Sequence, residues 1–439
     1  MKFYCRCRKF ATGGLCEVGA RATVPIMSLY RPAAPDLLTH TFLAMEQAAP
    51  DASDVYFGVL LRCGGVAPSV GELRAQVMSR VGMVPALTHR LNDAVEWEPD
   101  PEFDIENHVL VADGPVDVRP VREWMPDPPG HDHPLWRMWL LPGTGAEWGL
   151  AFAVHHGVLD GTGVMRALEV LFAGRAGSTV DDEVSGSAVA ALRAVPNMLR
   201  TLRSAPELNV FGELTGERRS DTAAVPVARL RAIADAAQVS VGQVHLVAMA
   251  GAVRRWTGVD ADVPVCVPVD TRRSDEHDRS GVHLGLVRIA LPTATEDPMR
   301  RIRLAAQRMS QRRMSSARIG ARALIDNVPV RWSGPALQRL GDRRKVALTA
   351  SVFRSAPGLS ILGRPVADLF ALPWLPPGHG CFTILARYGA TATLSVLTDT
   401  GVRGADELAR GWAREVAVLA DAAGVAPHAE DTAAPVMST

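Results

Sequence analysis

The 439-residue chain has no excess of charge of either sign, because 47 lysine and arginine residues balance 47 aspartate and glutamate residues. Nucleic-acid-binding proteins carry a clustered basic excess, so this balance argues against such a function. Lysine itself is almost absent and occurs only at Lys2, Lys9 and Lys345. We attribute the preference for arginine to the base composition of the genome rather than to function.

Cysteine is scarce and dispersed. Three of the six cysteines lie near the start and three are scattered along the chain: Cys5, Cys7, Cys16, Cys63, Cys266 and Cys381. Scattered cysteines in a chain of this length indicate reduced thiols inside the cell rather than a disulfide framework. The Cys5-x-Cys7 pair is too short and too isolated to predict a metal site.

Long apolar runs are also missing. No run approaches the roughly 18 residues that a membrane span needs. The first 26 residues include basic residues but lack the apolar core of a signal peptide. We therefore expect a cytoplasmic protein, with association at a membrane surface left open, and an N-terminal extension that is disordered or precedes the true start at Met27.

The chain is longer than one ordinary hydrophobic core accommodates, which predicts two domains. Predicted strands alternate with predicted helices in both halves, which indicates an α/β (α+β) fold. We divide the chain into a disordered extension, an N-terminal domain, a crossover linker, a C-terminal domain and a disordered tail, at residues 1–28, 29–176, 177–221, 222–425 and 426–439.

Apolar residues at helical spacing predict helices, and short runs of branched and aromatic residues predict strands. The predicted helices are Leu37–Gln47, a helix from the N-cap Ser69 to about Val81, Val118–Trp124, Thr162–Phe172, Val227–Ala237, Val241–Trp256, a basic helix Pro298–Ser315, and Glu407–Ala422. The predicted strands are Val55–Cys63, Val95–Trp97, His108–Leu110, Arg137–Leu141, Trp148–His155, Val263–Val269, Leu284–Leu291, Val346–Val352, Cys381–Tyr388 and Ala390–Leu397.

One segment carries the chemistry. His155 and His156 end an apolar strand, and Asp160-Gly161 follow after three residues. A neutral imidazole can take and return a proton near neutral pH. Adjacent residues on a strand point to opposite faces. We predict that His156 is a catalytic base facing a cavity, with His155 packed behind it and Asp160 stiffening the following turn by pairing with an arginine.

Two alternatives stay open from the residues alone. The histidines and Asp160 could bind a metal ion, although adjacent histidines on one strand face opposite ways and rarely share an ion. They could also be polar groups without a catalytic role, since four fixed residues can arise by chance and context must decide. The spacing favours a base that activates an acceptor to attack an acyl thioester.

Other residues have two interpretations. Pro134, Leu135 and Trp136 could bind the acyl part of a substrate, although large apolar residues beside a strand are more often core. His108 and His245 are predicted to be structural. The predicted basic helix has six arginines: Arg300, Arg301, Arg303, Arg308, Arg312 and Arg313. They form either a solvated face or a surface that binds an anionic partner. Such a partner could be the phosphates of coenzyme A, an acyl carrier protein or a membrane surface.

The motif His155-His156-x-x-x-Asp160-Gly161 resembles that of the coenzyme A-dependent acyltransferase superfamily, which includes chloramphenicol acetyltransferase and peptide-synthetase condensation domains. Its surroundings are similar to those of the bacterial wax ester synthase/diacylglycerol acyltransferase family, from about residue 36 to about residue 425. The segments that carry this similarity are Phe103–Val109, Pro134-Leu135-Trp136, Val267–Arg272 and Gly281–Leu291.

The resemblance implies two chloramphenicol-acetyltransferase-like domains with a tunnel between them. The pantetheine arm of an acyl thioester enters from one side and the acceptor from the other. It implies that His156 is the general base, that Asp160 is structural with Arg272 as its partner, and that Gly161 supports the turn. No metal or cofactor is implied; acyl-CoA or the phosphopantetheine thioester of an acyl carrier is a substrate.

The chain departs from the family pattern at two places. Ser240–Gln243 replaces an Asn-Asp pair, and Ser351–Gly358 replaces a Ser-Asn-Val-Pro-Gly-Pro segment. Both segments help to form the acceptor side in the family. The first interpretation is an acyl-CoA-dependent O-acyltransferase, and the departures leave two alternatives open. One is a natural-product acyltransferase or condensation-type enzyme that takes its acyl group from a carrier protein and forms an ester or amide. The other is a non-catalytic relative that binds lipid or a partner.

Overall fold

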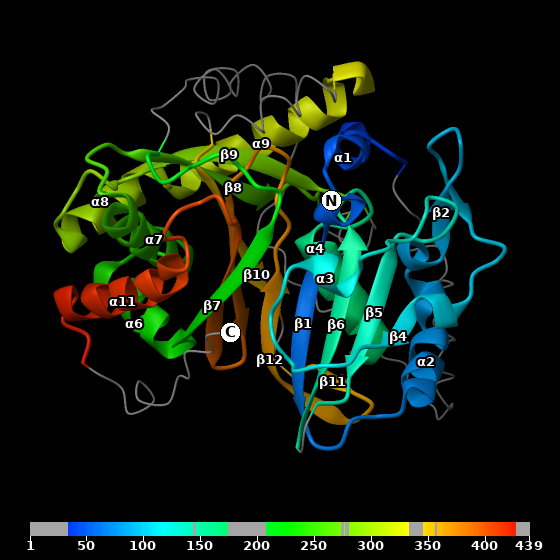
Figure 1. Ribbon diagram of the computed structural model, residues 1–439. Coiled ribbons are helices and arrows are strands. Elements are labelled where there is room, and N and C mark those ends of the chain that lie inside the picture. Colours follow the sequence, from blue (N-terminus) through cyan, green and yellow to red (C-terminus); the bar gives the residue numbers. More distant parts are fainter. Residues whose placement is uncertain are drawn as a thin grey trace, which may run out of the picture.

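The computed structural model describes residues 34–143, 146–173, 208–273, 276, 281–332, 346–355 and 358–426. The predicted disordered extension, most of the predicted crossover linker and nearly all of the predicted tail lie outside these residues. The described part contains two six-stranded sheets, which Figure 1 shows beside each other. The buried apolar residues form two hydrophobic cores. The fold is therefore mixed α/β, as the alternation of elements predicts.

The first sheet has the strand order β11-β12-β1-β6-β5-β4. Its strands are β11 (Ser360–Ile361), β12 (Arg364–Leu372), β1 (Tyr56–Gly64), β6 (Glu147–His155), β5 (Trp136–Leu141) and β4 (Val109–Val111). β5 and β6 pair in antiparallel fashion, which confirms the hairpin expected from the sequence. β6 in turn pairs with β1, so the strand that ends in His155 is central and buried on both faces.

The second sheet has the strand order β7-β14-β13-β10-β8-β9. Its strands are β7 (Arg218–Pro226), β14 (Thr391–Asp399), β13 (Cys381–Tyr388), β10 (Leu348–Arg354), β8 (Val263–Asp270) and β9 (Leu284–Leu291). A separate two-stranded ribbon joins β2 (His89–Leu91) to β3 (Trp97–Pro99). Val95 has a positive φ of 57°, so the strand predicted at Val95–Trp97 begins two residues late, after a turn.

The two halves of the chain exchange strands. β11 and β12 come from the second half, yet β12 pairs with β1 and completes the first sheet. β7 begins at Arg218, inside the segment predicted to be linker. A division at residue 221 therefore does not match the sheets, because long-range strand pairing, which no local pattern encodes, assigns residues 360–372 to the first sheet.

The helices follow the predicted positions closely, with one exception. They are α1 (Leu37–Ala48), α2 (Val70–Met78), α3 (Val121–Trp124), α4 (Gly161–Leu168), α6 (Val227–Ala237), α7 (Val241–Thr257), α8 (Pro298–Arg308), α9 (Gln311–Asn327) and α11 (Glu407–Ala422). The predicted single helix Pro298–Ser315 is wrong, because Ser310 has extended backbone angles and begins a new helix. The capping box of Ser69 and Glu72 is confirmed at the start of α2.

The predicted basic face is also divided. Arg301 is buried and donates to Glu415 at 2.9 Å, and Arg308 donates to Asp262 at 2.6 Å. The four other arginines of the set are exposed: Arg300, Arg303, Arg312 and Arg313. Arg301 is therefore internal and Arg308 is held in a partly exposed ion pair, so the solvated face is smaller than the sequence indicates.

No single helix within the described ranges has the length and apolar character needed to cross a membrane. One bent pair, α6 and α7, meets those criteria together, with an angle of 97° between its members.

Candidate active site

The paired histidines lie where the central strand β6 ends and helix α4 begins, as the sequence predicts. The His155 ring is fully buried, lies edge-on to Tyr56 at 5.3 Å between ring centroids, and accepts the Gly157 N–H at Nδ1 over 3.0 Å. The His156 ring instead lines a cavity. The two side chains thus have different surroundings, which matches the expectation that one packs and the other faces the cavity.

Aromatic rings hold His156 on three sides. Its ring stacks between Phe42 and Phe57, with centroid distances of 4.3 and 4.2 Å, and Trp374 lies edge-on at 5.0 Å. Its backbone N–H donates to the Val55 carbonyl over 3.0 Å. Burial lowers the pKa of the His156 imidazole to about 4, against a smaller opposing effect of the Asp160 carboxylate. The imidazole is therefore neutral at pH 7 and able to accept a proton.

The cavity beside His156 lies between the two sheets and has about 1190 Å³ of empty space, its open mouth included. Its walls are mainly apolar. They come from α1, from the motif turn and from strands of both sheets, and include Leu38, Met45, Val269, Leu286, Val352, Phe382 and Ile384. An apolar space with a few polar groups is typical of a small-molecule site.

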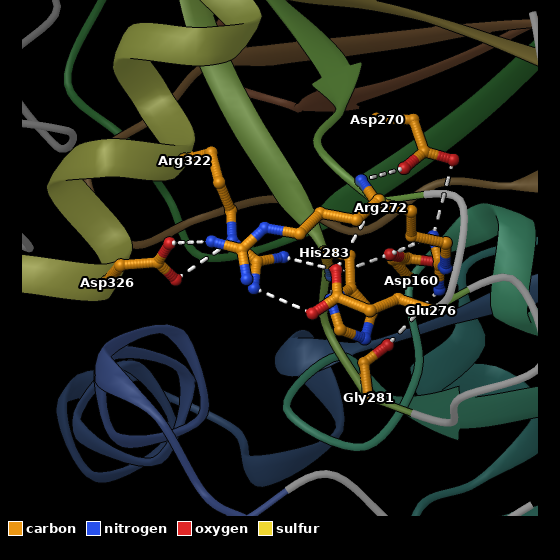
Figure 2. Close-up of polar contacts among 9 residues, drawn as sticks. Asp160, Asp270, Arg272, Glu276, Gly281, His283, Arg322 and Asp326 are labelled. Carbon is orange, nitrogen blue, oxygen red and sulfur yellow. Dashed lines mark hydrogen bonds and ion pairs between the residues drawn. The ribbon is translucent and has the colours of Figure 1, made fainter. Parts of the chain in front are cut away.

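Asp160 is the N-cap of α4 and accepts the Gly163 N–H over 2.8 Å. Arg272, two residues after β8, donates one hydrogen bond of 2.8 Å to each carboxylate oxygen of Asp160 (Figure 2). This confirms the expected pairing. The His283 backbone N–H adds a third bond over 2.8 Å. Burial raises the pKa of Asp160, but Arg272 lowers it by more, to about 2, so the carboxylate stays ionised.

The same arginine ties the motif turn to the second sheet. Arg272 also contacts Asp270 at 3.4 Å and the Gly281 carbonyl at 3.5 Å, and the Thr162 hydroxyl donates to Asp270 over 3.2 Å. Arg322 of α9 forms a further ion pair with Glu276 at 2.6 Å, which is drawn near the centre of Figure 2. The contacts of Asp160 and Thr162 with Arg272 and Asp270 cross from the motif turn and α4 to the end of β8, so they join the two halves of the chain beside the cavity.

The predicted substrate residues do not line this cavity. Trp136 is fully buried in the first core, donates its indole N–H to the Leu87 carbonyl over 2.8 Å and stacks on His108 at 4.6 Å. Pro134 and Leu135 precede it and are buried beside it. Trp136 thus packs against Leu87, which precedes β2, and against His108, and this placement favours the packing role over substrate contact.

His108 and His245, which the sequence predicts to be structural, are both buried away from the cavity. His108 is buried and its Nδ1 lies 2.9 Å from the Trp136 carbonyl. His245 is buried inside α7 and lies edge-on to Trp412 at 5.9 Å. Neither lines the cavity beside His156, which supports the structural interpretation of both.

Sequence reasoning missed the aromatic residues around the base. Phe42, Phe57, Trp374 and Phe353 come from α1, β1, the segment after β12, and β10. In the sequence each belongs to an apolar pattern that indicates ordinary core, and nothing local distinguishes a cavity wall from a filled core. The sequence did give one indication of an unusual wall: the segment Ser351–Gly358, which contains Phe353, departs from the family pattern.

Possible metal ligands do not gather in the part of the chain that the structure describes: no group of three or more His, Cys, Asp or Glu side chains could hold an ion. The Asp160 carboxylate is bonded to Arg272 and to the backbone N–H groups of Gly163 and His283. What the arrangement offers chemically is one neutral imidazole at the wall of an apolar cavity.

Solved structures of two enzymes share this fold. The fold is similar to that of a wax ester synthase/diacylglycerol acyltransferase from Marinobacter aquaeolei VT8, with a TM-score of 0.64, 16% identity, and coverage of 89% of this chain and 100% of that chain. It is also similar to a mutant starter condensation domain of rhizomide synthetase in complex with C8-CoA and Leu-SNAC, with a TM-score of 0.63, 17% identity and coverage of 92% and 97%.

Sequence comparison gives the family. The wax ester synthase/diacylglycerol acyltransferase catalytic domain matches residues 66–179, and the C-terminal domain of the same family matches residues 280–419. A relative from Mycobacterium tuberculosis, named as a probable diacylglycerol O-acyltransferase, is 23% identical over 376 residues, which cover 74% of this chain and 81% of the relative. The chain belongs to the wax ester synthase/diacylglycerol acyltransferase family.

Proposed function

We propose that the protein moves an acyl group from acyl-CoA to the hydroxyl of an apolar acceptor, with His156 as the general base. One observation carries this proposal: the neutral His156 ring, held between Phe42 and Phe57, lines a mainly apolar cavity between the two sheets. The name of the mycobacterial relative supports a diacylglycerol as acceptor. The C8-CoA in the rhizomide synthetase domain supports an acyl-CoA donor.

The proposed reaction is a direct transfer. The acceptor oxygen attacks the thioester carbonyl carbon while His156 takes the hydroxyl proton. The carbon–sulfur bond then breaks, and the imidazolium returns the proton to the leaving thiolate, so that the products are an ester and free coenzyme A. A positioned base of this kind contributes about 10² to 10⁴ to the rate.

Asp160 and Gly161 have supporting parts in this proposal. Asp160 is bonded to Arg272 on both oxygens, so it stabilises the turn and does not exchange protons with substrate. His155 holds the same turn from behind through Gly157. Of the three residues expected to be catalytic, the geometry supports proton transfer by His156 and positioning by the other two.

The test is release of coenzyme A from acyl-CoA in the presence of a diacylglycerol or a long-chain alcohol. The His156→Ala variant should lose at least about 10²-fold in kcat. The matched control is His89→Ala, which removes a half-buried imidazole of β2 bonded to Thr88 and should retain activity. A folded His156→Ala variant with wild-type turnover would show that this mechanism is wrong.

A condensation-type reaction is the second candidate, and the altered second half of the chain favours it. Ser240 and Gln243 form a capping box at the start of α7 instead of presenting an Asn-Asp pair, and Phe353 lines the cavity. Acyl-CoA and acyl carrier protein are to be compared as donors with the same acyl group and acceptor. Faster turnover of the carrier-bound group, or amide formation, would favour this candidate over the first.

The non-catalytic alternative needs a site blocked by side chains. Instead, His156 opens onto empty space, which argues against that alternative.

A further inference from the structure

Helix α1 carries a carboxylate, Glu46, that lies between two histidines. The Glu46 Oε2 atom accepts a hydrogen bond from His131 Nε2 over 2.7 Å, and the same oxygen lies 3.8 Å from Nε2 of His155. The exposed fractions of the side chains are 44% for His131, 13% for Glu46 and 0% for His155. The three side chains thus form a continuous series from the surface to the residue next to the proposed base.

The protonation of His155 follows from its partners. The Gly157 N–H donates to Nδ1, so Nδ1 carries no proton. Burial lowers the pKa of His155 to about 4, so the ring is neutral at pH 7 and its single proton is on Nε2. Among the described residues that buried Nε2 has no hydrogen-bond partner, and Glu46 is the carboxylate that faces it.

Glu46 is suited to stay ionised in this position. Burial raises the pKa of its carboxyl, but the hydrogen bond from His131 and the nearby imidazoles lower it by more. The same hydrogen bond raises the pKa of His131. The other groups that face the series are the buried Tyr56 hydroxyl, whose pKa burial and Glu46 raise, and Asp132, which acts on His131.

The same helix contacts the motif turn at two further points. Phe42, one helical turn before Glu46, stacks on His156 at 4.3 Å. The Thr39 hydroxyl donates to the Gly157 carbonyl over 3.4 Å. Residues 39, 42 and 46 share one face of α1, so this helix contacts each of the three residues His155, His156 and Gly157 by a different side chain.

We propose that Glu46 is a positioning residue for the acyl transfer, and that it acts through His155. Its carboxylate selects the Nε2-protonated form of His155, which leaves Nδ1 free to accept the Gly157 N–H and hold the turn that orients His156. Without the carboxylate, the buried Nε2–H faces no acceptor, so the other tautomer becomes competitive and the Gly157 bond is lost. The inference rests on the proposed role of His156 as base.

The test compares Glu46→Leu and the isosteric Glu46→Gln with wild type, in full-length protein. The readouts are kcat, KM for acyl-CoA, and the ¹⁵N chemical shifts of the His155 ring. We expect kcat of Glu46→Leu to fall by about 10- to 100-fold, as a small misplacement of a base does, with KM changed less than about twofold and the His155 proton moved toward Nδ1. Glu46→Gln, whose amide oxygen can still accept, should show smaller changes in the same direction.

The control is His131→Gln, which removes the exposed imidazole but can still donate to Glu46, and which should keep wild-type kcat and the His155 tautomer. Wild-type kcat and ring shifts in a folded Glu46→Leu protein would overturn the proposal. So would equal losses of kcat in Glu46→Leu and His131→Gln with an unchanged tautomer, because these would indicate a general structural role. The tautomer is measured without turnover, so it remains decisive even if His156→Ala keeps activity and the proposed function fails.

Discussion

Gly161 of the motif turn lies directly against the ring of Phe353 on β10, so closely that a Cβ atom at position 161 would be 2.4 Å from Cε1 of Phe353. The contact joins the two halves of the chain beside the cavity, because Phe353 also lines it and lies 6.3 Å from the Phe57 ring. The glycine in the motif is thus required by a neighbour in the second sheet.

The first prediction follows from this contact. Gly161→Ala should lower both stability and kcat, since the Phe353 ring must move and such overpacking costs about 1–3 kcal/mol. Denaturant unfolding and the coenzyme A release assay measure the two effects. Adding Phe353→Leu should restore part of the loss. Equal losses in the single and double variants would show that Phe353 is not the obstacle.

The second prediction concerns Asp160 and Arg272. Arg272→Met leaves the Asp160 carboxylate buried without its partner, which should cost about 3–5 kcal/mol of unfolding free energy. Urea unfolding measures it. As a control, Arg219→Ala removes a partly exposed ion pair with Asp221 and should cost less than about 1 kcal/mol. Similar small changes in both variants would contradict the structural role of the buried pair.

The third prediction is a pH profile. The base must be unprotonated to act, and burial lowers the pKa of His156 to about 4. The kcat/KM value should therefore remain level from pH 7 down to about pH 5 and fall only below that. An ordinary imidazole would give half-maximal activity near pH 6.5. A half-maximal point near 6.5, in protein shown to be folded at that pH, would contradict the buried, neutral base.

The fourth prediction concerns stability. Burial lowers the pKa of His155 and His156 to about 4 and that of His245 to about 3. Between these values and about pH 6.5 the unfolded chain binds more protons, so unfolding free energy should fall as pH is lowered from 7 to 4, by up to about 1.4 kcal/mol per pH unit for each imidazole. His131 has a raised pKa and acts against this trend. Unfolding at a series of pH values tests it, and His245→Phe should make the slope shallower.

The fifth prediction separates packing from substrate contact. Trp136→Phe removes the hydrogen bond to the Leu87 carbonyl and leaves a buried acceptor unsatisfied, which should cost about 1–3 kcal/mol of stability with KM unchanged. Trp374→Leu, in the cavity wall, should instead change kcat or KM. A large increase in KM for Trp136→Phe would contradict the packing role and indicate that Trp136 contacts the substrate.

Local signals explain what could be predicted. The β5–β6 hairpin, the Ser69 capping box and the strand-to-helix turn after His156 all depend on residues close in sequence, and the structure contains all three. Asp160 and Arg272 are 112 positions apart in the sequence. Their pairing was predicted from the family resemblance, because no rule of local spacing covers such a distance.

What could not be predicted depends on distant contacts. Phe42, Phe57 and Trp374 converge on His156 from three separate elements, and each looks like ordinary core in its own segment. Glu46 ends an amphipathic helix, where a carboxylate indicates solvent exposure rather than a contact with His155. For Trp136 the sequence left both substrate contact and core packing open, because a large apolar side chain beside a strand occurs in either place, although more often in core.

The insertion of β12 beside β1 has a consequence for biosynthesis. Arg62 of β1 and its ion-pair partner Asp368 of β12 are 306 positions apart. A nascent chain that has completed β4, β5 and β6 still presents β1 as an edge strand, with unpaired backbone groups open to another chain. The first sheet therefore closes only after most of the polypeptide has left the ribosome, so that folding of the half that carries His156 is completed by the half that follows it.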